Sequence, residues 1–240
     1  MQIKKLFLSA VLVATLPAAA QAKDQDFFIG VDVLGGVASG SSSTKNGGGV
    51  LPLFNGDGVV DHVDFGEMIG IGGHIGYRFN PTWSATISYQ HFRGDVRWDA
   101  TFPTYGGASG FDGKATSNVI IGHIAYTRPL SEATSASVKA GLGVAFNRLS
   151  KVAETDMASG LFVSDLAAHT KTSPTAQIGL GIEHRLTPGM SVGLDAAFTY
   201  AGGFETGNTR TGNLGVTSIN PYKIDDVWRG TLGASLKVAF

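Results

Sequence analysis

The sequence contains no cysteine, which excludes disulfide bonds, thiolate metal sites and cysteine nucleophiles. Charged residues make up only 15% of its 240 positions, whereas a soluble domain usually has about a quarter. No stretch of roughly 20 consecutive apolar residues follows residue 22, so membrane-spanning helices are not expected. The formal net charge is −1, which argues against a nucleic-acid-binding protein.

The first 22 residues, MQIKKLFLSAVLVATLPAAAQA, have the organisation of an export signal. Lys4 and Lys5 precede a short apolar run, and Ala20 and Ala22 form the A-x-A pattern of signal-peptidase cleavage. We therefore predict a cleaved signal peptide over residues 1–22 and one mature domain over residues 23–240. Export to an oxidising compartment is consistent with the absence of cysteine.

Glycine is abundant, with 34 residues, and apolar residues alternate with small or polar ones along much of the chain. A period of two predicts β-strands with one apolar and one polar face. The alternating segments are residues 27–37, 68–79, 83–90, 118–126, 136–147, 176–186, 190–200 and 228–240.

The connections between these segments alternate in length. Short Pro- and Gly-containing turns occur at residues 80–81, 129–133 and 187–189. Long loops are predicted at about residues 38–64, 98–115, 151–171 and 203–226. Short turns at one end and long loops at the other are typical of outer-membrane barrels, and a soluble sandwich would not pair them so regularly. The sequence predicts an all-β fold, an eight-stranded antiparallel transmembrane up-and-down β-barrel.

Aromatic residues gather at both ends of the apolar rows, as in the two girdles of a lipid-facing surface. The predicted short-turn girdle comprises Phe27, Tyr77, Phe79, Trp83, Tyr126 and Phe240, and the predicted long-loop girdle comprises Phe65, Phe146, Phe198, Tyr200 and Trp228.

The terminal stretch LGASLKVAF places Leu236, Val238 and Phe240 at alternating positions. With the signal peptide and strand pattern, the chain resembles the small eight-stranded outer-membrane barrels of the OmpA, OmpX and opacity-protein type. The resemblance implies a location in the cell outer membrane and an assembly signal formed by Phe240, Val238 and Leu236. The implied partners are outer-membrane lipids, the barrel assembly machinery and a host or surface ligand bound by the loops, and nucleic acid is not among them.

The polar rows contain charged residues that would lie in the lumen. The interior of an eight-stranded barrel is just wide enough for side chains to fill, and buried charges are costly unless they are paired. We predict a structural ion-pair network of Asp32, Lys139, Glu183, Asp195 and Lys237. Strand order suggests that Lys139 lies near Glu183, and Lys237 near Asp195 and Asp32. A narrow pore is the alternative interpretation.

Catalytic patterns are weak. His62, His91 and His169 fall near the long loops, as do Ser41–Ser43 and Ser173, but no His-x-Ser pair occurs. The acidic stretch NGDGVVDHVD (residues 55–64) does not match EF-hand spacing. We expect no catalytic, metal or cofactor site.

The predicted function is a non-enzymatic structural and surface-interaction role of the loops, with a narrow porin-like channel as the alternative and a lipid A-modifying barrel enzyme third.

Overall fold

A computed structural model describes residues 26–42, 59–102, 106–213 and 215–240, which form one antiparallel sheet of thirteen strands. The predicted signal peptide and the centre of the first predicted loop lie outside these residues. The strands are β1 (Phe27–Ser41), β2 (Val59–Phe65), β3 (Met68–Arg78), β4 (Trp83–Phe102), β5 (Gly107–Pro129), β6 (Thr134–Leu149), β7 (Val152–Asp156), β8 (Phe162–Leu166), β9 (His169–Thr187), β10 (Met190–Glu205), β11 (Thr209–Gly212), β12 (Gly215–Ser218) and β13 (Lys223–Ala239). Within the described residues, no helix has the length and apolar character to cross a membrane.

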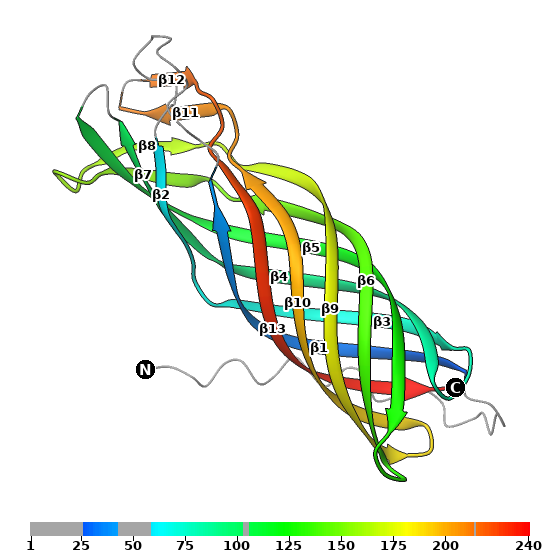
Figure 1. The fold of residues 1–240 in the computed structure, drawn as a ribbon. Coiled ribbons are helices and arrows are strands. Elements are labelled where there is room, and N and C mark those ends of the chain that lie inside the picture. Colours follow the sequence, from blue (N-terminus) through cyan, green and yellow to red (C-terminus); the bar gives the residue numbers. More distant parts are fainter. Residues whose placement is uncertain (1–25, 43–58, 103–105, 214) are drawn as a thin grey trace.

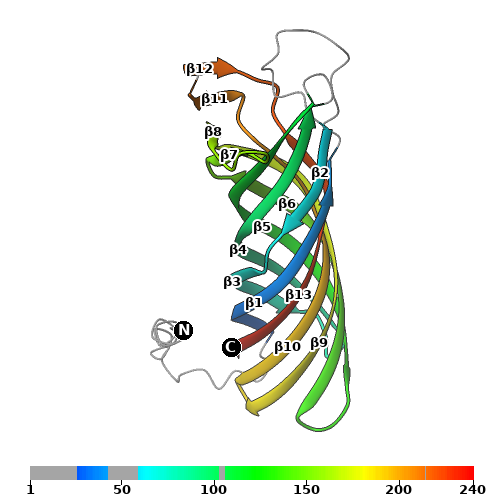
Figure 2. The same ribbon diagram turned by 90° about the vertical axis from the view of Figure 1, so that its left-hand side faces the viewer.

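Eight long strands form a closed ring in the order β1, β3, β4, β5, β6, β9, β10 and β13 (Figures 1 and 2). The ring closes because β13 pairs with β1 from Phe28↔Ala239 to Ser41↔Asp225. The backbone N–H of Phe240 also donates to the carbonyl of Phe27 at 2.9 Å, so the final residue is attached to the first strand. The predicted eight-stranded antiparallel barrel is confirmed.

Side chains alternate between an exposed apolar row and an inward row along these strands. Leu142, Leu194 and Leu232 are 74%, 68% and 71% exposed, and they lie on the outer, lipid-facing row. Phe27 packs on Tyr77 at 4.8 Å between ring centroids near the short turns, and Phe198 stacks on Trp228 at 5.0 Å near the opposite end. The outer surface therefore has an aliphatic band between two groups of aromatic rings.

The prediction that Phe65 belongs to the long-loop girdle is wrong. Phe65 lies on β2 and is only 6% exposed, with its ring 5.6 Å from that of Phe204. Phe65 therefore belongs to an interior core and does not face lipid. The physical reason is that β2 lies beyond the membrane band, where the apolar row faces inward.

The predicted loops contain more strand than expected. The span 98–115 is mostly strand, because β4 continues to Phe102 and β5 begins at Gly107. In this part the inward row is apolar and buried, including Val96, Trp98 and Phe111. The outward row is charged and includes Arg97 and Asp112. The strands continue past the membrane with their polarity inverted, because water is now outside and a protein core is inside.

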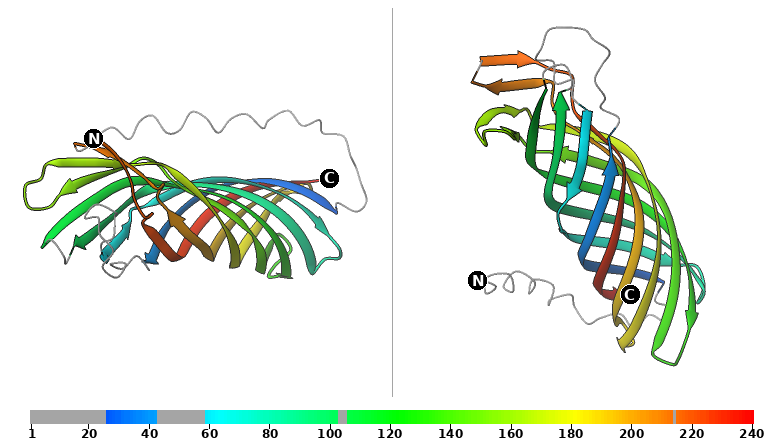
Figure 3. Two further views of the ribbon diagram at one scale, coloured as in Figure 1. Left: turned by 90° about the horizontal axis from the view of Figure 1, so that it is seen from above. Right: turned by 60° about the vertical axis from the view of Figure 1, so that its left-hand side comes forward.

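The spans 151–171 and 203–226 likewise contain the hairpins β7–β8 and β11–β12. β7 pairs with β5, and β11 pairs with β8, so both hairpins extend the barrel sheet sideways at this end. Figure 3 shows this lateral extension above the barrel.

We predict that Leu194→Arg will destabilise the barrel by about 2–4 kcal/mol, because it places a charge in the lipid-facing band midway along β10. Val216→Arg is the matched control, because Val216 is similarly exposed (70%) but lies on β12, beyond the membrane band. The free energy of unfolding in lipid vesicles measures both effects. Equal destabilisation by the two substitutions would contradict the assigned lipid face.

Candidate functional site

The charged side chains of the lower lumen form three pairs. Nζ of Lys139 lies 2.8 Å from Oδ1 of Asp195, and Nδ1 of His74 lies 3.1 Å from Oδ2 of Asp32. Lys237 pairs with Glu183, which also accepts a hydrogen bond from Ser191 at 2.7 Å. All five residues predicted for the lumen network are therefore paired there. Lys139–Asp195 and Lys237–Glu183 are ion pairs, and Asp32 is hydrogen-bonded to His74.

The partners differ from the predicted ones. Lys139 was expected beside Glu183, and Lys237 beside Asp195 and Asp32. In the structure, Lys139 pairs with Asp195 and Lys237 with Glu183. Asp32 contacts His74 instead. Each lysine reaches over the adjacent strand. Lys139 of β6 crosses β9 to reach β10, and Lys237 of β13 crosses β10 to reach β9. A tightly curved wall brings every second strand within reach of a long side chain, which simple strand adjacency does not predict.

Inward glycines provide the space for these crossings. A Cβ atom at Gly179 would lie 2.9 Å from Cε of Lys139, and one at Gly181 would lie 2.7 Å from Oδ1 of Asp195. Both glycines are on β9, directly beneath the Lys139–Asp195 pair. Their missing side chains allow the pair to lie flat against the wall.

Two hollows flank these pairs. A cavity of about 130 Å³ lies within the lumen and is lined by residues including His74, His123, Lys139 and Asp195. A vestibule of about 660 Å³ opens at the short-turn end beside Arg78, Glu183, Arg185 and Lys237. The Lys237–Glu183 pair borders both hollows, so it separates the cavity from this opening.

The opposite half of the lumen is closed by apolar packing. Trp98 stacks on Phe111 at 5.3 Å, and Tyr222 packs against both rings. Below this core the guanidinium of Arg229 lies 3.6 Å from the centre of the Phe92 ring, and both side chains are only 1% exposed. Nε and Nη2 of Arg229 have no hydrogen-bond partner in the described part of the chain. Together these large side chains fill the lumen on the hairpin side.

A buried ion pair holds the two hairpins to the barrel. Glu154 of β7 is 2% exposed, and its Oε2 lies 2.7 Å from Nη2 of Arg210 on β11. Ser109 and Ser164 donate their hydroxyl groups to the same carboxylate, at 3.1 and 2.5 Å. This network joins β5, β7, β8 and β11, although Glu154 and Arg210 appear in the sequence as ordinary loop charges.

The hairpin surface carries exposed apolar side chains. These are Met157, Leu161, Phe162 and Val216, which are between 47% and 70% exposed. Among the described strands, β12 pairs only with β11 and forms one of the two edges of the sheet, and β2 forms the other. We call β7, β8, β11, β12 and their turns the hairpin platform.

Outward charges on β4 and β5 form a ladder above the lipid-facing band. Arg97 pairs with Asp112 at 2.6 Å, and Lys114 pairs with Asp95 at 2.8 Å. The hydrogen bond from Lys114 lowers the pKa of Asp95, and the hydrogen bond to Asp112 raises the pKa of Arg97. This ladder faces water and marks where the lipid-facing band ends.

Five of the six histidines, all in the described part of the chain, have a polar side-chain partner. His91 is hydrogen-bonded to Asn118, His123 to Gln177 and His184 to Thr134. His62 and His74 have carboxylate partners, but no Ser or Thr hydroxyl in the described chain is bonded to either ring. The described residues also contain no cluster of three or more His, Cys, Asp or Glu side chains that could hold a metal ion.

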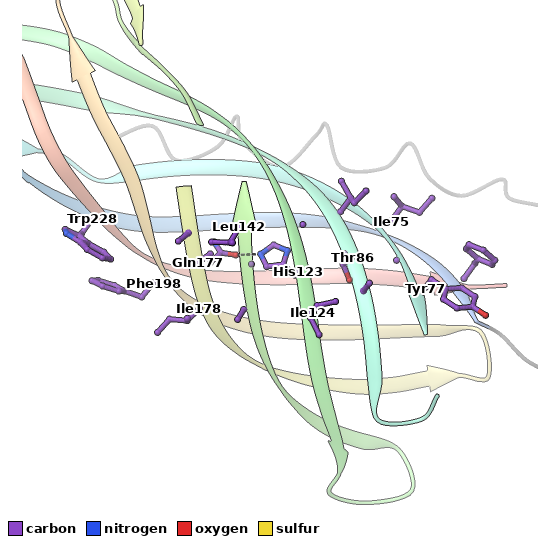
Figure 4. Close-up of a pocket in the computed structure, with 18 residues that line it drawn as sticks. Ile75, Tyr77, Thr86, His123, Ile124, Leu142, Gln177, Ile178, Phe198 and Trp228 are labelled. Atoms are coloured by element: carbon purple, nitrogen blue, oxygen red, sulfur yellow. Dashed lines mark hydrogen bonds between the residues drawn. The ribbon is translucent and has the colours of Figure 1, made fainter. Parts of the chain in front are cut away.

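An apolar groove of about 1080 Å³ runs across the outer wall (Figure 4). Its lining follows one hydrogen-bonded row, in which Ile124 is next to Ala140, Ala140 next to Ile178 and Ile178 next to Phe198. The small side chains of this row, Gly122 and the alanines, leave a depression between larger neighbours such as Ile87 and Leu142. His123 and Gln177, joined at 2.8 Å, lie behind the groove on the inward row.

We predict that Lys139→Met will destabilise the barrel by up to about 3 kcal/mol, because Asp195 would lose its cationic partner. The two side chains remain about a quarter exposed (25% and 27%), so the loss should lie below the range for fully buried pairs. The double variant Lys139→Met/Asp195→Leu should recover most of the loss. A double-mutant cycle on the free energy of unfolding measures the coupling, and additive losses would contradict a direct interaction.

We predict that Arg210→Met will loosen the hairpin platform, because it leaves the carboxylate of Glu154 buried without a cation. Amide hydrogen exchange in β11 and β12 should accelerate at least tenfold, while exchange in the barrel part of β10 stays slow. Lys151→Met is the control, because Lys151 is 67% exposed and its pair with Asp165 should contribute little. Unchanged exchange in Arg210→Met would show that the pair does not hold the platform.

Comparison with known proteins agrees with this architecture. The family described as outer membrane protein beta-barrel domain matches residues 7–220. Neisserial surface protein A is a similar solved structure, with a TM-score of 0.51 and 15% identity, covering 89% of this chain and 97% of that one. OprG from Pseudomonas aeruginosa has a TM-score of 0.49 and 17% identity, with coverage of 88% and 95%. Ail of Yersinia pestis has a TM-score of 0.44 and 14% identity, with coverage of 90% and 98%.

No curated protein matches the sequence. The family match nevertheless spans most of the chain and includes seven of the eight strands of the ring, which β13 closes. The chain is therefore a member of the outer membrane protein beta-barrel domain family, and its place is the outer membrane.

Proposed function

We propose that this protein is a non-enzymatic surface-interaction protein whose hairpin platform binds a partner outside the cell. The observation that carries the proposal is the platform itself. It exposes Met157, Leu161, Phe162 and Val216 to water while the buried Glu154–Arg210 pair holds it to the barrel. Apolar side chains gathered on a rigid outer surface are typical of interaction sites.

The edge strand β12 adds a second feature suited to binding. It pairs with β11 through residues 215–218, and the sheet order places no described strand on its other side. An exposed sheet edge offers backbone N–H and C=O groups to an incoming extended segment. The lone apolar side chain of Val216 on this edge would contact such a segment.

A channel is the second candidate, and the vestibule and cavity at the short-turn end are what favour it. The hairpin-side half of the lumen argues against it, because Phe92, Trp98, Phe111 and Arg229 are almost fully buried there. Such a core leaves no polar path for water through that half of the lumen. The same packing gives no support to a lipid A-modifying centre in the lumen.

The proposal is tested by replacing the four exposed apolar side chains together, as Met157→Ser, Leu161→Ser, Phe162→Ser and Val216→Ser. The folded protein in lipid nanodiscs is applied to immobilised laminin, fibronectin, collagen and cultured epithelial cells. Binding by the unmodified protein that falls at least tenfold in the variant is expected. The control is Leu130→Ser, since Leu130 is 61% exposed but lies in a turn at the opposite end. Equal loss in the control, or no binding to any surface, would contradict the proposal.

We also expect the unmodified protein to show no steady conductance in planar bilayers, because the apolar core and the Arg229–Phe92 contact close the lumen. The double variant Phe92→Ala/Arg229→Ala should produce intermittent conductance by opening a gap above the cavity. Tyr89→Ala is the control, because Tyr89 lies on the same strand and faces outward. A large, steady conductance of the unmodified protein would instead favour the channel.

A further inference from the structure

The outer wall has one row of side chains in which two arginines lack a carboxylate partner. Arg93 of β4 is in register with Thr116 of β5, which is in register with Arg148 of β6. Thr170 of β9 continues the row, and its Oγ1 accepts a hydrogen bond from Nη1 of Arg148 at 3.4 Å. Arg93 and Arg148 are exposed, and neither forms an ion pair in the described part of the chain.

These arginines differ from the basic residues around them. Arg97, Lys114, Lys151 and Arg210 lie above this row, and Lys171 lies one residue below Thr170. Each of these five side chains is within 4 Å of a carboxylate. Asp95 interacts electrostatically with Arg93 but is paired with Lys114, and Glu67 lies on the other side of β4 from Arg148. Neither Arg93 nor Arg148 therefore has a carboxylate within ion-pair distance in the described part of the chain.

The row lies at the upper border of the lipid-facing band. Two positions lower on the same strands are His91, Asn118 and Phe146, followed by Tyr89, Ile120 and Val144. Oδ1 of Asn118 accepts a hydrogen bond from Tyr89 and contacts His91, both at 2.8 Å. These polar side chains lie above aliphatic ones, and this is the depth at which lipid headgroups lie.

The apolar groove begins beneath the same strands. Gly122, Ile87 and Leu142 line it and are neighbours in one register row across β4, β5 and β6. Gly122 is six residues below Thr116 on β5, which is about 20 Å along the strand. A cationic row above and an apolar groove below are complementary to the two ends of an anionic lipid.

We propose that Arg93 and Arg148 bind the phosphate groups of an outer-leaflet lipid whose acyl chains lie in the groove at Gly122. The two arginines are two strand spacings apart, about 10 Å, and they can hold either one phosphate or two on the same headgroup. Guanidinium groups bind phosphate oxygens in a bidentate manner, and the Thr116 hydroxyl between them supplies a further donor. This site is independent of the hairpin platform, because it uses different strands and a different depth.

The test measures binding of bisphosphorylated lipid A by native mass spectrometry to the folded protein in detergent micelles. Arg93→Gln/Arg148→Gln should weaken binding at least tenfold. Arg97→Gln is the matched control, because Arg97 is also exposed on β4 but is paired with Asp112 and lies four residues further from the membrane. Heat-modifiable migration verifies that each variant is folded.

Two further binding experiments test the phosphate groups and the acyl chains of the ligand separately. Lipid A without phosphate should bind the unmodified protein at least tenfold more weakly. Gly122→Leu should weaken binding of the phosphorylated lipid, because it adds a side chain to the groove at a position where a Cβ atom has no neighbour closer than 4.0 Å. Unchanged binding by the double arginine variant, or an equal loss in Arg97→Gln, would overturn the proposal. Full competition by millimolar inorganic phosphate would overturn the lipid assignment in favour of a free-phosphate site.

Discussion

The closure of β13 onto β1 is the interaction on which the rest of the structure depends. In lipid no water is available to satisfy backbone N–H and C=O groups, so a spanning sheet must have no free edge. Pairing from Phe28↔Ala239 to Ser41↔Asp225 removes both edges together. The hydrogen bond from Phe240 to Phe27 extends this closure to the last residue. The alternation of the terminal segment is therefore required by its position beside β1.

Closure with eight strands also determines what the lumen can contain. The wall curves so tightly that side chains meet over an intervening strand, as in the Lys139–Asp195 and Lys237–Glu183 pairs. Space for the Lys139–Asp195 pair comes from Gly179 and Gly181, where an added Cβ atom would lie within 3 Å of the paired side chains. Glycine in these strands is thus a packing requirement. It weakens the local strand preference, and the hydrogen-bonded ring compensates for it.

The medium outside the wall explains why polarity inverts along single strands. In the membrane band β5 presents Ile120 and Ile124 outward and the buried His123 inward. Higher on the same strand, Asp112 and Lys114 face water, whereas Phe111 and Ala115 are buried inside. One continuous strand therefore serves first as a lipid-facing wall and then as part of a soluble-like sheet. The apolar core formed there closes the lumen and supports the hairpin platform.

Eight strands, their tight turns and the lipid-facing row were evident from the sequence, because the period-two pattern is local. Lateral extension of the sheet was not evident, because β7, β8, β11 and β12 are four or five residues long and carry no clear alternation. The site was only partly predictable. The five lumen residues could be named from the inward rows, but their partners depend on curvature and on the missing side chains of glycines.

Glu154 and Phe65 show most clearly what could not be predicted from the sequence. A sequence identifies Glu154 as a loop acid and Phe65 as a girdle aromatic, yet both are buried in the structure. By itself the sequence determined which residues alternate, and hence the barrel and its lipid-facing band. Only the tertiary structure decided which charges meet, where strands pass from lipid into water, and which arginines remain unpaired at that border. These depend on contacts between strands distant in the chain, which local periodicity does not encode.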